Sequence, residues 1–441
     1  MTDSDEHDAM SDTSSEPVRR QSSRVGRRWV VLAVGFLVMA LGFGLRNAFS
    51  VFYPEIVADF GWSRGGTAAM FSLNIFVYGL LSPVVGSLVH RFKPQVLLSV
   101  GIVVIGGGAV LCGFATSEWH FYLLYGVLVA IGAALIGVTP LATIVTPWFA
   151  KNRGLVFSIL ASGFGVSLVS ASLVQYLIST HGWRNAYFIT GVAVITIVVP
   201  LTLLFIRRAP VVGQGEATAE TTERPEDTSP EEHVRWQHGD WSLRQVLKTP
   251  QFWMLWLAGF FQIGIAEKIA IAHQVYFFRD AGYSPMDAAM FYSVFGVLFV
   301  VGTLASSVSD RLGRERVFLP ACGLSIASVA LLFMIRDATH PWMASLFAAC
   351  FGLGLGAMPP ALFASVADLF HGKSYGSIVG MMVLGVSLGG AVSPWLAGYM
   401  HDVTGNYTSS LFLLLAALVV CGLLFRLVAP ARLSPVRGDR S

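Results

Sequence analysis

Apolar stretches of about 18 residues or more recur along the chain, and short polar segments separate them. An α-helix rises about 1.5 Å per residue, so each stretch can cross a hydrocarbon core of about 30 Å. The pattern predicts an all-α polytopic membrane protein with twelve transmembrane helices. The expected spans are residues 29–54, 65–89, 95–115, 119–147, 155–178, 185–206, 250–276, 285–308, 316–334, 342–368, 376–400 and 408–428.

The composition supports this fold class. Only 12% of the 441 residues are charged and 54% are hydrophobic, with a mean hydropathy of +0.65. Soluble domains carry about 25% charged residues. The sequence shows no phosphate-binding loop, no zinc or redox spacing of cysteines and no ligand cluster. We therefore expect no catalytic residue, no metal and no cofactor.

Positive charge is distributed unevenly between the two ends of the spans. With the N-terminus inside, the cytoplasmic segments hold 23 of the 29 Lys and Arg residues, and the outer loops hold four. Lys and Arg concentrate on the cytoplasmic side of membrane proteins. We expect a multi-pass protein of the cell (inner) membrane with both termini in the cytoplasm. Residues 1–28 are expected to be disordered, and residues 429–441 to form a cytoplasmic tail.

Two halves of the chain resemble each other. The tetrapeptide "AAMF" occurs at 68–71 and again at 288–291, and Pro140 pairs with Pro360. Several such matches, each shifted by about 220 residues, indicate a duplicated six-span unit. We expect an N-terminal bundle over 29–206 and a C-terminal bundle over 249–428. The polar segment 207–248 between them is expected to be a cytoplasmic linker.

The loop after the second span of each half carries a recognisable motif. The chain resembles the major facilitator superfamily, which has G-x-x-x-D-R-x-G-R there. "SSVSDRLGRER" (306–316) has Ser306 for the first glycine and keeps the rest of this pattern. "GSLVHRFKP" (86–94) has His90 in place of the acid. His90 is either a plain loop residue or a pH-dependent one. The motif residues that we assign to gating are Arg91, Asp310, Arg311 and Arg314.

The resemblance implies two parallel, pseudo-symmetric six-helix bundles, and loops that pair across the halves to hold one access state. Three segments also resemble the bacterial monocarboxylate-transporter-like (oxalate/formate-exchanger-like) branch of that superfamily. Spans 285–308 and 376–400 hold no charge beyond Asp287, so the coupling residues of other members have no counterpart there. The segments that carry the resemblance are "GLRNAFSVFYPEIVADFGWSR" (44–64), "PWFAKNRGL" (147–155) and "HQVYFFRDAGYS" (273–284).

Three charges lie deep within predicted spans. Glu267 and Lys268 are adjacent in "FFQIGIAEKIAIAHQ" (260–274), and Arg46 is the counterpart of Glu267 at a shift of 221. A charge in hydrocarbon is costly, so such residues face a partner or a watery cavity. The resemblance implies that the first and seventh spans line a central cavity, with Arg46 and Glu267 facing each other. The three charges sum to +1, which a monoanion would neutralise.

We assign substrate binding to Arg46 and Lys268, and proton coupling to Glu267 and His273. Two simpler interpretations remain open: Glu267 and Lys268 neutralise each other, and His273 is a hydrogen-bonded histidine at the outer end of its helix. On a straight helix Lys268 points away from the face that carries Glu267. Either Gly264 allows a kink, or Lys268 points toward a neighbouring helix.

Other polar residues are candidates to line the path. Asn74, Tyr78 and Ser82 recur at four-residue spacing and so share one helix face, and Tyr125 lies in the fourth span. We assign Asn74, Tyr78 and Tyr125 to substrate binding. Contacts between helices explain such a stripe equally well.

These observations predict a secondary carrier that moves a small organic anion, a monocarboxylate, with a proton by alternating access. In this hypothesis Glu267 competes with the anion for Arg46, and protonation of Glu267 frees that cation. The alternatives are an anion exchanger or metabolite exporter of the same fold, a non-transporting metabolite sensor and, least favoured, an intramembrane enzyme. We expect a monomer whose partners are the anion, protons and the lipid bilayer, with no nucleic acid.

Overall fold

The computed structural model describes residues 15–149, 153–207, 241–370 and 374–428. The first helix begins at Ser15, so residues 15–28 are helical, where we expected disorder. The C-terminal tail 429–441 and residues 208–240 of the expected linker lie outside the described residues, as do residues 1–14. Residues 241–248 include a short helix that opens with a capping box between Ser242 and Gln245.

The N-terminal half of the described chain is entirely helical between its turns. Its elements follow the predicted spans, with several interruptions that the hydropathy pattern does not reveal. In chain order they are α1 (Ser15–Asn47), α2 (Phe49–Phe60), α3 (Arg64–Arg91), α4 (Pro94–Cys112), α5 (Glu118–Phe121), the π-helix η1 (Tyr122–Val129), α6 (Ala130–Leu135), α7 (Val138–Val145), the 3₁₀ turn η2 (Thr146–Trp148), α8 (Arg153–Val169) and α9 (Ala171–Phe205).

The C-terminal half is helical in the same way. Helices α12, α14 and α17 each open with a proline in the first turn, where the missing N–H costs nothing. The elements are α11 (Leu243–Val246), α12 (Pro250–Gly259), the π-helix η3 (Phe260–Glu267), α13 (Lys268–Asp280), α14 (Pro285–Ala305), the 3₁₀ turn η4 (Ser306–Val308), α15 (Ser309–Leu312), α16 (Arg314–Met334), α17 (Pro341–Leu369), α18 (Tyr375–Thr404) and α19 (Thr408–Val428).

The number of membrane passes agrees with the prediction. The described residues contain 11 helical segments that are long and apolar enough to cross a membrane, one of which, Ser158–Phe205, has 48 residues. Gly182 interrupts this segment with φ +78° and ψ 159°, a conformation that favours glycine. The segment is therefore two passes joined by a tight reversal, which gives the expected twelve.

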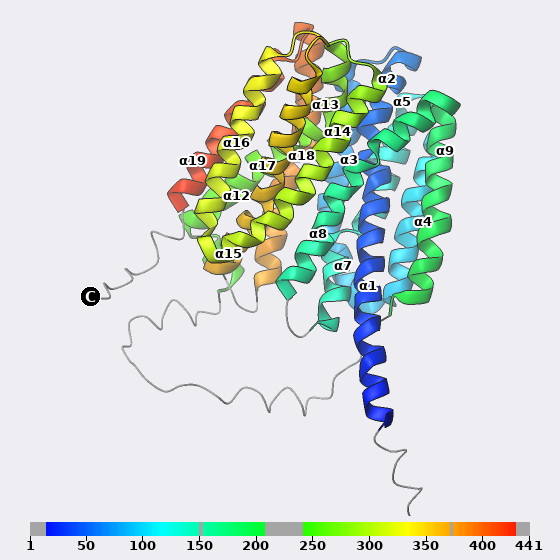
Figure 1. Cartoon of the computed structure of the whole chain (residues 1–441), viewed down its shortest axis with the longest axis vertical. Coiled ribbons are helices and arrows are strands. Elements are labelled where there is room, and N and C mark those ends of the chain that lie inside the picture. The colour runs from blue at the N-terminus through cyan, green and yellow to red at the C-terminus, as the bar shows by residue number, and fades with distance from the viewer. Residues whose placement is uncertain (1–14, 150–152, 208–240, 371–373, 429–441) are drawn as a thin grey trace, which may run out of the picture.

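The two halves lie side by side, with α1 to α9 on one side and α12 to α19 on the other (Figure 1). Helices α3 and α18 pack against each other across the boundary, as do α8 and α14. Small residues allow the close approach: Gly79 lies against Ser387, and Gly165 against Val300. Large apolar side chains such as Leu80 and Phe114 are exposed on the outside, as expected of a lipid-facing surface.

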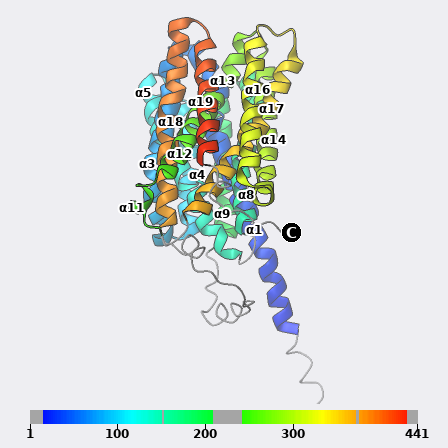
Figure 2. The ribbon, with the colours of Figure 1, turned by 90° about the vertical axis from the view of Figure 1, so that its left-hand side faces the viewer.

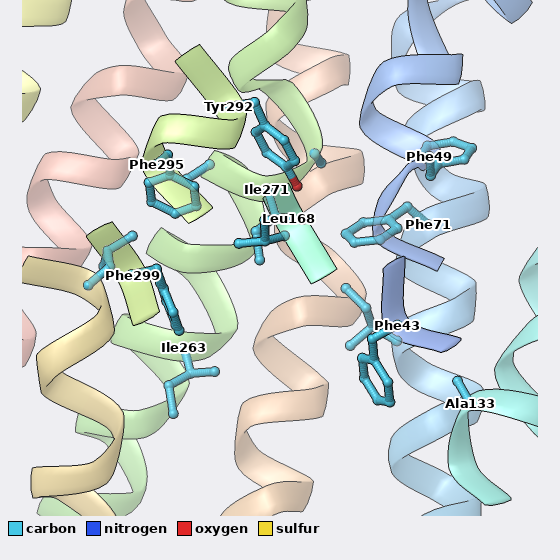
Figure 3. Packing of buried hydrophobic residues seen from close by; sticks show 14 of the residues in the cluster. Phe43, Phe49, Phe71, Ala133, Leu168, Ile263, Ile271, Tyr292, Phe295 and Phe299 are labelled. Carbon is cyan, nitrogen blue, oxygen red and sulfur yellow. The ribbon is translucent and has the colours of Figure 1, made fainter. Parts of the chain in front are cut away.

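The bundle has two distinct ends. Helix α1 extends well beyond the other helices at one end, where α19 also finishes (Figure 2). We call this end the terminal face, and the opposite end, where α2 ends and α3 begins, the distal face. Between the ends, Phe43 and Phe71 of the first half lie opposite Tyr292 and Phe299 of the second (Figure 3).

Candidate functional site

Arg46 lies where the first span is broken. Helix α1 ends at Asn47 and α2 begins at Phe49. Arg46 is 4% exposed, and within the described chain it forms no ion pair. Aromatic rings surround the guanidinium: its Cζ lies 4.9 Å from the ring centroid of Tyr78 and 5.5 Å from that of Phe43. Cation–π attraction partly compensates the lost hydration of this charge.

A ring of hydrogen bonds between three spans fixes the position of Arg46. Its Nε donates to Asn74 Oδ1 at 2.5 Å, and Asn74 Nδ2 donates to the backbone oxygen of Tyr125 at 2.7 Å. The Tyr125 hydroxyl in turn donates to the backbone oxygen of Arg46 at 2.8 Å. The break in the first span and the π-helix η1 leave backbone carbonyls available to such partners.

The structure thus brings together four of the five residues assigned to substrate binding. Asn74 and Tyr125 use their polar groups to hold Arg46, which makes them positioning residues. Within the described chain the guanidinium of Arg46 makes one hydrogen bond, from Nε to Asn74, and its two terminal amino groups make none. The N–H donors on this edge of the guanidinium are therefore unused.

Glu267 and Lys268 form an ion pair with each other. Lys268 Nζ donates to Glu267 Oε1 at 2.5 Å, and both residues are buried. No contact joins Glu267 to Arg46 in the described residues, so the structure does not support direct competition of Glu267 for Arg46. The simpler interpretation, that the two neighbours neutralise each other, describes this conformation. The π-helix η3 ends at Glu267 and changes the angle between successive side chains around the helix axis. This change allows the neighbouring side chains of Glu267 and Lys268 to pair.

Lys268 nevertheless points toward the other half. A Cβ atom added at Gly390 would lie 3.2 Å from Lys268 Cγ and would also contact Ile75 of α3. Lys268 and Ile75 therefore meet at this glycine. Lys268 Nζ lies 5.1 Å from the Phe164 ring centroid. Phe164 packs edge-on against Phe43 at 6.0 Å, and Arg46 lies over Phe43. The two cations therefore lie over the two rings of one aromatic pair.

His273 lies away from this cluster, nearer the distal face. Its Nε2 is 2.8 Å from the backbone oxygen of Pro394, which can only accept, so this nitrogen carries a proton. Its Nδ1 is 3.0 Å from the Tyr407 hydroxyl. Burial raises the pKa of Tyr407, so that hydroxyl keeps its proton and can donate it. These hydrogen bonds fit a neutral histidine that joins α13 to α18. This is the simpler of the two interpretations of His273, that of a hydrogen-bonded histidine.

The motif loop of the second half (306–316) forms ion pairs within that half. Arg314 pairs with Asp310 and, at 2.9 Å, with Asp368 at the end of α17. Arg91 and Arg311 are exposed and have no ion-pair partner in the described part of the chain. The expectation that these loop residues pair across the halves is therefore not met in this conformation.

Pairing across the halves occurs instead at the distal face. The Arg64 guanidinium holds both carboxylate oxygens of Asp280, at 2.5 and 2.9 Å. Asp402 accepts the backbone N–H groups of Arg64 and Gly65, at 3.0 and 2.7 Å. We call Arg64, Asp280 and Asp402 the distal clamp. Sequence analysis missed it because Arg64 lies 216 and 338 residues from its two acidic partners, and no local pattern marks them.

A second cross-half ion pair accompanies the clamp. Arg279 NH1 lies 2.7 Å from Glu55 Oε1. Asp59 lies 221 residues before Asp280, at the repeat shift, and is therefore its counterpart in the first half. By contrast with Asp280, it pairs at 2.7 Å with Arg184 of its own half. The distal face is thus closed by charged contacts between the halves.

Comparison with known proteins agrees with this architecture. The family model of the Major Facilitator Superfamily matches residues 43–362 and again 303–441. Monocarboxylate transporter 13 of Bos taurus is 30% identical over 404 residues, which cover 90% of this chain and 88% of the relative. An uncharacterized transporter of that superfamily type, YcxA of Bacillus subtilis (strain 168), is 26% identical over 388 residues, covering 86% and 90%.

Among solved structures, a bacterial homolog of the human lysosomal transporter Spinster, in an inward-facing and occupied conformation, superposes with a TM-score of 0.68. The sequence identity is 20%, with 91% of this chain and 97% of that chain covered. At this identity the likeness concerns the fold alone.

Proposed function

Because the chain belongs to the major facilitator superfamily, we propose that it is a secondary carrier that moves a small organic anion, a monocarboxylate, together with a proton by alternating access. Its relatives are transporters and it is not an enzyme. The distribution of Lys and Arg supports cytoplasmic termini in the cell (inner) membrane, with the distal face outside.

The observation that carries this proposal is the buried charge of Arg46 without a carboxylate partner. A buried charge is costly unless it is paired. Asn74 orients the guanidinium but adds no charge, and Glu267 already neutralises Lys268. The site therefore has one net positive charge, which a monoanion complements. The relatives named monocarboxylate transporters support a carboxylate as that anion.

The ion pair of Glu267 with Lys268 supports a route for the proton. When a carboxylate enters beside Arg46, it can also replace Glu267 as the partner of Lys268. Glu267 then takes up a proton, because an unpaired buried carboxylate is better neutral. Arg46, Lys268 and Glu267 carry a net +1 when the site is empty. With the anion bound and Glu267 protonated the total is again +1, so the cycle moves no net charge through the site.

The test uses purified protein in liposomes with a pH-sensitive dye inside. Addition of a transported monocarboxylate outside should acidify the lumen. Arg46→Gln should abolish this signal, whereas Arg336→Gln, which removes an exposed Arg near the distal face, should leave it intact. Uptake that is unchanged in Arg46→Gln would refute the proposed site.

Glu267→Gln separates symport from exchange. This variant should lose uphill uptake driven by a pH gradient but still exchange labelled anion between preloaded vesicles and the medium. If wild-type protein exchanges anions without any pH signal, the exchanger of the same fold is the correct function. Proton-driven uptake that persists in Glu267→Gln would show that the proton does not use this residue.

A further inference from the structure

A cavity lies inside the bundle of the second half, and neither Arg46 nor any of its partners lines it. Residues of α13, α16, α17 and α19 form its walls, which are almost entirely apolar and include Phe277, Phe347 and Phe351. The centres of water-sized molecules have about 30 Å³ available in it. One water needs about 10–15 Å³ of such space, so the cavity has room for roughly two waters or one organic molecule of similar size.

Four polar side chains lie in the wall of this cavity, and three of them already have partners. His273 bonds through both ring nitrogens, to a backbone oxygen and to the Tyr407 hydroxyl. Ser410 donates to the backbone oxygen of Ala397 at 3.0 Å. Gln274 is the exception: it is 5% exposed, and neither polar atom of its amide has a hydrogen-bond partner among the described residues. A buried amide without a partner is unfavourable, so this wall lacks a group that would pair with it.

The chemistry of the Gln274 amide defines what can pair with it. A primary amide presents N–H donors and a carbonyl acceptor side by side. A carboxamide or a protonated carboxylic acid has the complementary pair and can bond to both atoms at once. A buried water needs two to four polar partners, and this wall provides one unpaired side chain. None of the described residues that line the cavity is Asp, Glu, Lys or Arg, so an ion would remain uncompensated there.

From these observations we propose that the second half holds a second binding site, separate from Arg46, for a small neutral molecule. This molecule has a hydrogen-bond donor and an acceptor side by side, as carboxamides and protonated carboxylic acids do, and an apolar remainder. The proposal goes beyond the proposed function and does not depend on it. Tyr407 lines the cavity and also accepts from Arg64 NH1 of the distal clamp at 3.4 Å. A molecule bound to Gln274 therefore lies beside a residue that contacts the clamp.

The test compares acetamide with acetone, which has nearly the same size but no N–H donor. Binding to the purified protein in detergent is followed by saturation-transfer NMR and titrated to about 100 mM, because so small a molecule binds weakly. We expect acetamide to bind at least about threefold more tightly than acetone, the gain from a hydrogen bond to Gln274 Oε1. Equal binding of the two probes, or no binding of acetamide, would overturn the proposal.

Two glutamines of the seventh span provide matched variants. Gln274→Met removes the amide at similar side-chain volume and should abolish the preference for acetamide. Gln262→Met is the control and should leave the preference unchanged: Gln262 is also buried with both polar atoms of its amide unpaired, but it does not line the cavity. A preference that survives in folded Gln274→Met, or that disappears equally in both variants, would refute the assignment to this cavity.

A measurement on the wild-type protein locates the site even if Gln274→Met does not fold. Acetamide should shift the methyl resonances of Leu414, which lines the cavity, and leave those of Leu427, an exposed residue on the same helix, unchanged. Equal shifts at both leucines, or none at Leu414, would contradict the proposal. Acetic acid distinguishes the two ligand classes: binding that depends on Gln274 and strengthens as the pH falls identifies a protonated acid, whereas tighter binding of acetamide at every pH identifies a carboxamide.

Discussion

At the scale of single residues, the choice of Asn74 as the partner of Arg46 is informative. An amide and a carboxylate can both accept the Nε hydrogen at 2.5 Å. Only the amide leaves the positive charge of Arg46 uncompensated. The folded protein therefore lacks the stability that an ion pair would add at this site. In return, the positive charge of Arg46 stays available to an anion.

Asn74→Asp tests this argument. The new carboxylate would pair with Arg46 but could no longer donate to the backbone oxygen of Tyr125. These two effects on the thermal midpoint in detergent oppose each other, whereas the positive charge of Arg46 is neutralised in either case. A charged hydrogen bond contributes about 1.5–3 kcal/mol, so anion uptake should fall at least tenfold. A misfolded variant would lose stability and uptake together. Retained uptake in a folded variant would contradict the proposed role of Arg46.

The sequence allowed part of this site to be predicted. Arg46 was recognisable because a charge within an apolar span is costly, and the polar stripe on the second span made Asn74 and Tyr78 candidates to line the path. That both lie against Arg46 came only from the structure. The partner of Glu267 depends on the π-helix η3, which no hydropathy pattern reveals. Arg64 was indistinguishable from any outer-loop arginine, because its acidic partners come from the other half.

At the scale of elements, backbone irregularities lie next to the functional residues. The first span breaks after Arg46, the fourth contains η1, which includes Tyr125, and the seventh contains η3, which ends at Glu267. Helical regions were predictable from hydropathy because length and apolarity decide them. The interruptions were not, because they depend on packing between helices, such as the bond of Ser393 to the backbone oxygen of Gly264 at 2.7 Å.

Gly264→Ala tests the contact of η3 with α18. A methyl group there would lie 2.9 Å from the Val386 backbone oxygen and 3.0 Å from Gly389 Cα. Overpacking of this kind costs about 1–3 kcal/mol, so the thermal midpoint should fall and uptake should weaken. Gly380→Ala on α18, where nothing lies within 4 Å, is the matched control and should be neutral. Equal effects of both variants would contradict the packing argument.

At the scale of the whole molecule, the contacts between the halves are ionic at the distal face. Along the helices they are made by small and apolar residues together with a few hydroxyl hydrogen bonds, such as that of Ser172 with Ser293 at 2.8 Å. The distal clamp joins Arg64 to Asp280 and Asp402, while α3 meets α18 through small residues such as Gly79. Apolar surfaces of this kind can slide, whereas directional ion pairs hold one arrangement. In the proposed cycle, the clamp must open before an anion can enter from outside.

Asp280→Asn should therefore shift the molecule toward a conformation open at the distal face. The loss of an ion pair worth about 1 kcal/mol changes a two-state ratio roughly fivefold. Spin labels at Thr116 and Ala338, exposed positions on the distal loops of the two halves, would report a longer distance population. Asp59→Asn is the control, because Asp59 occupies the equivalent position in the repeat but pairs with Arg184 of its own half. A distance distribution that responds equally to both variants would mean that charge at this face, rather than pairing between the halves, sets the conformation.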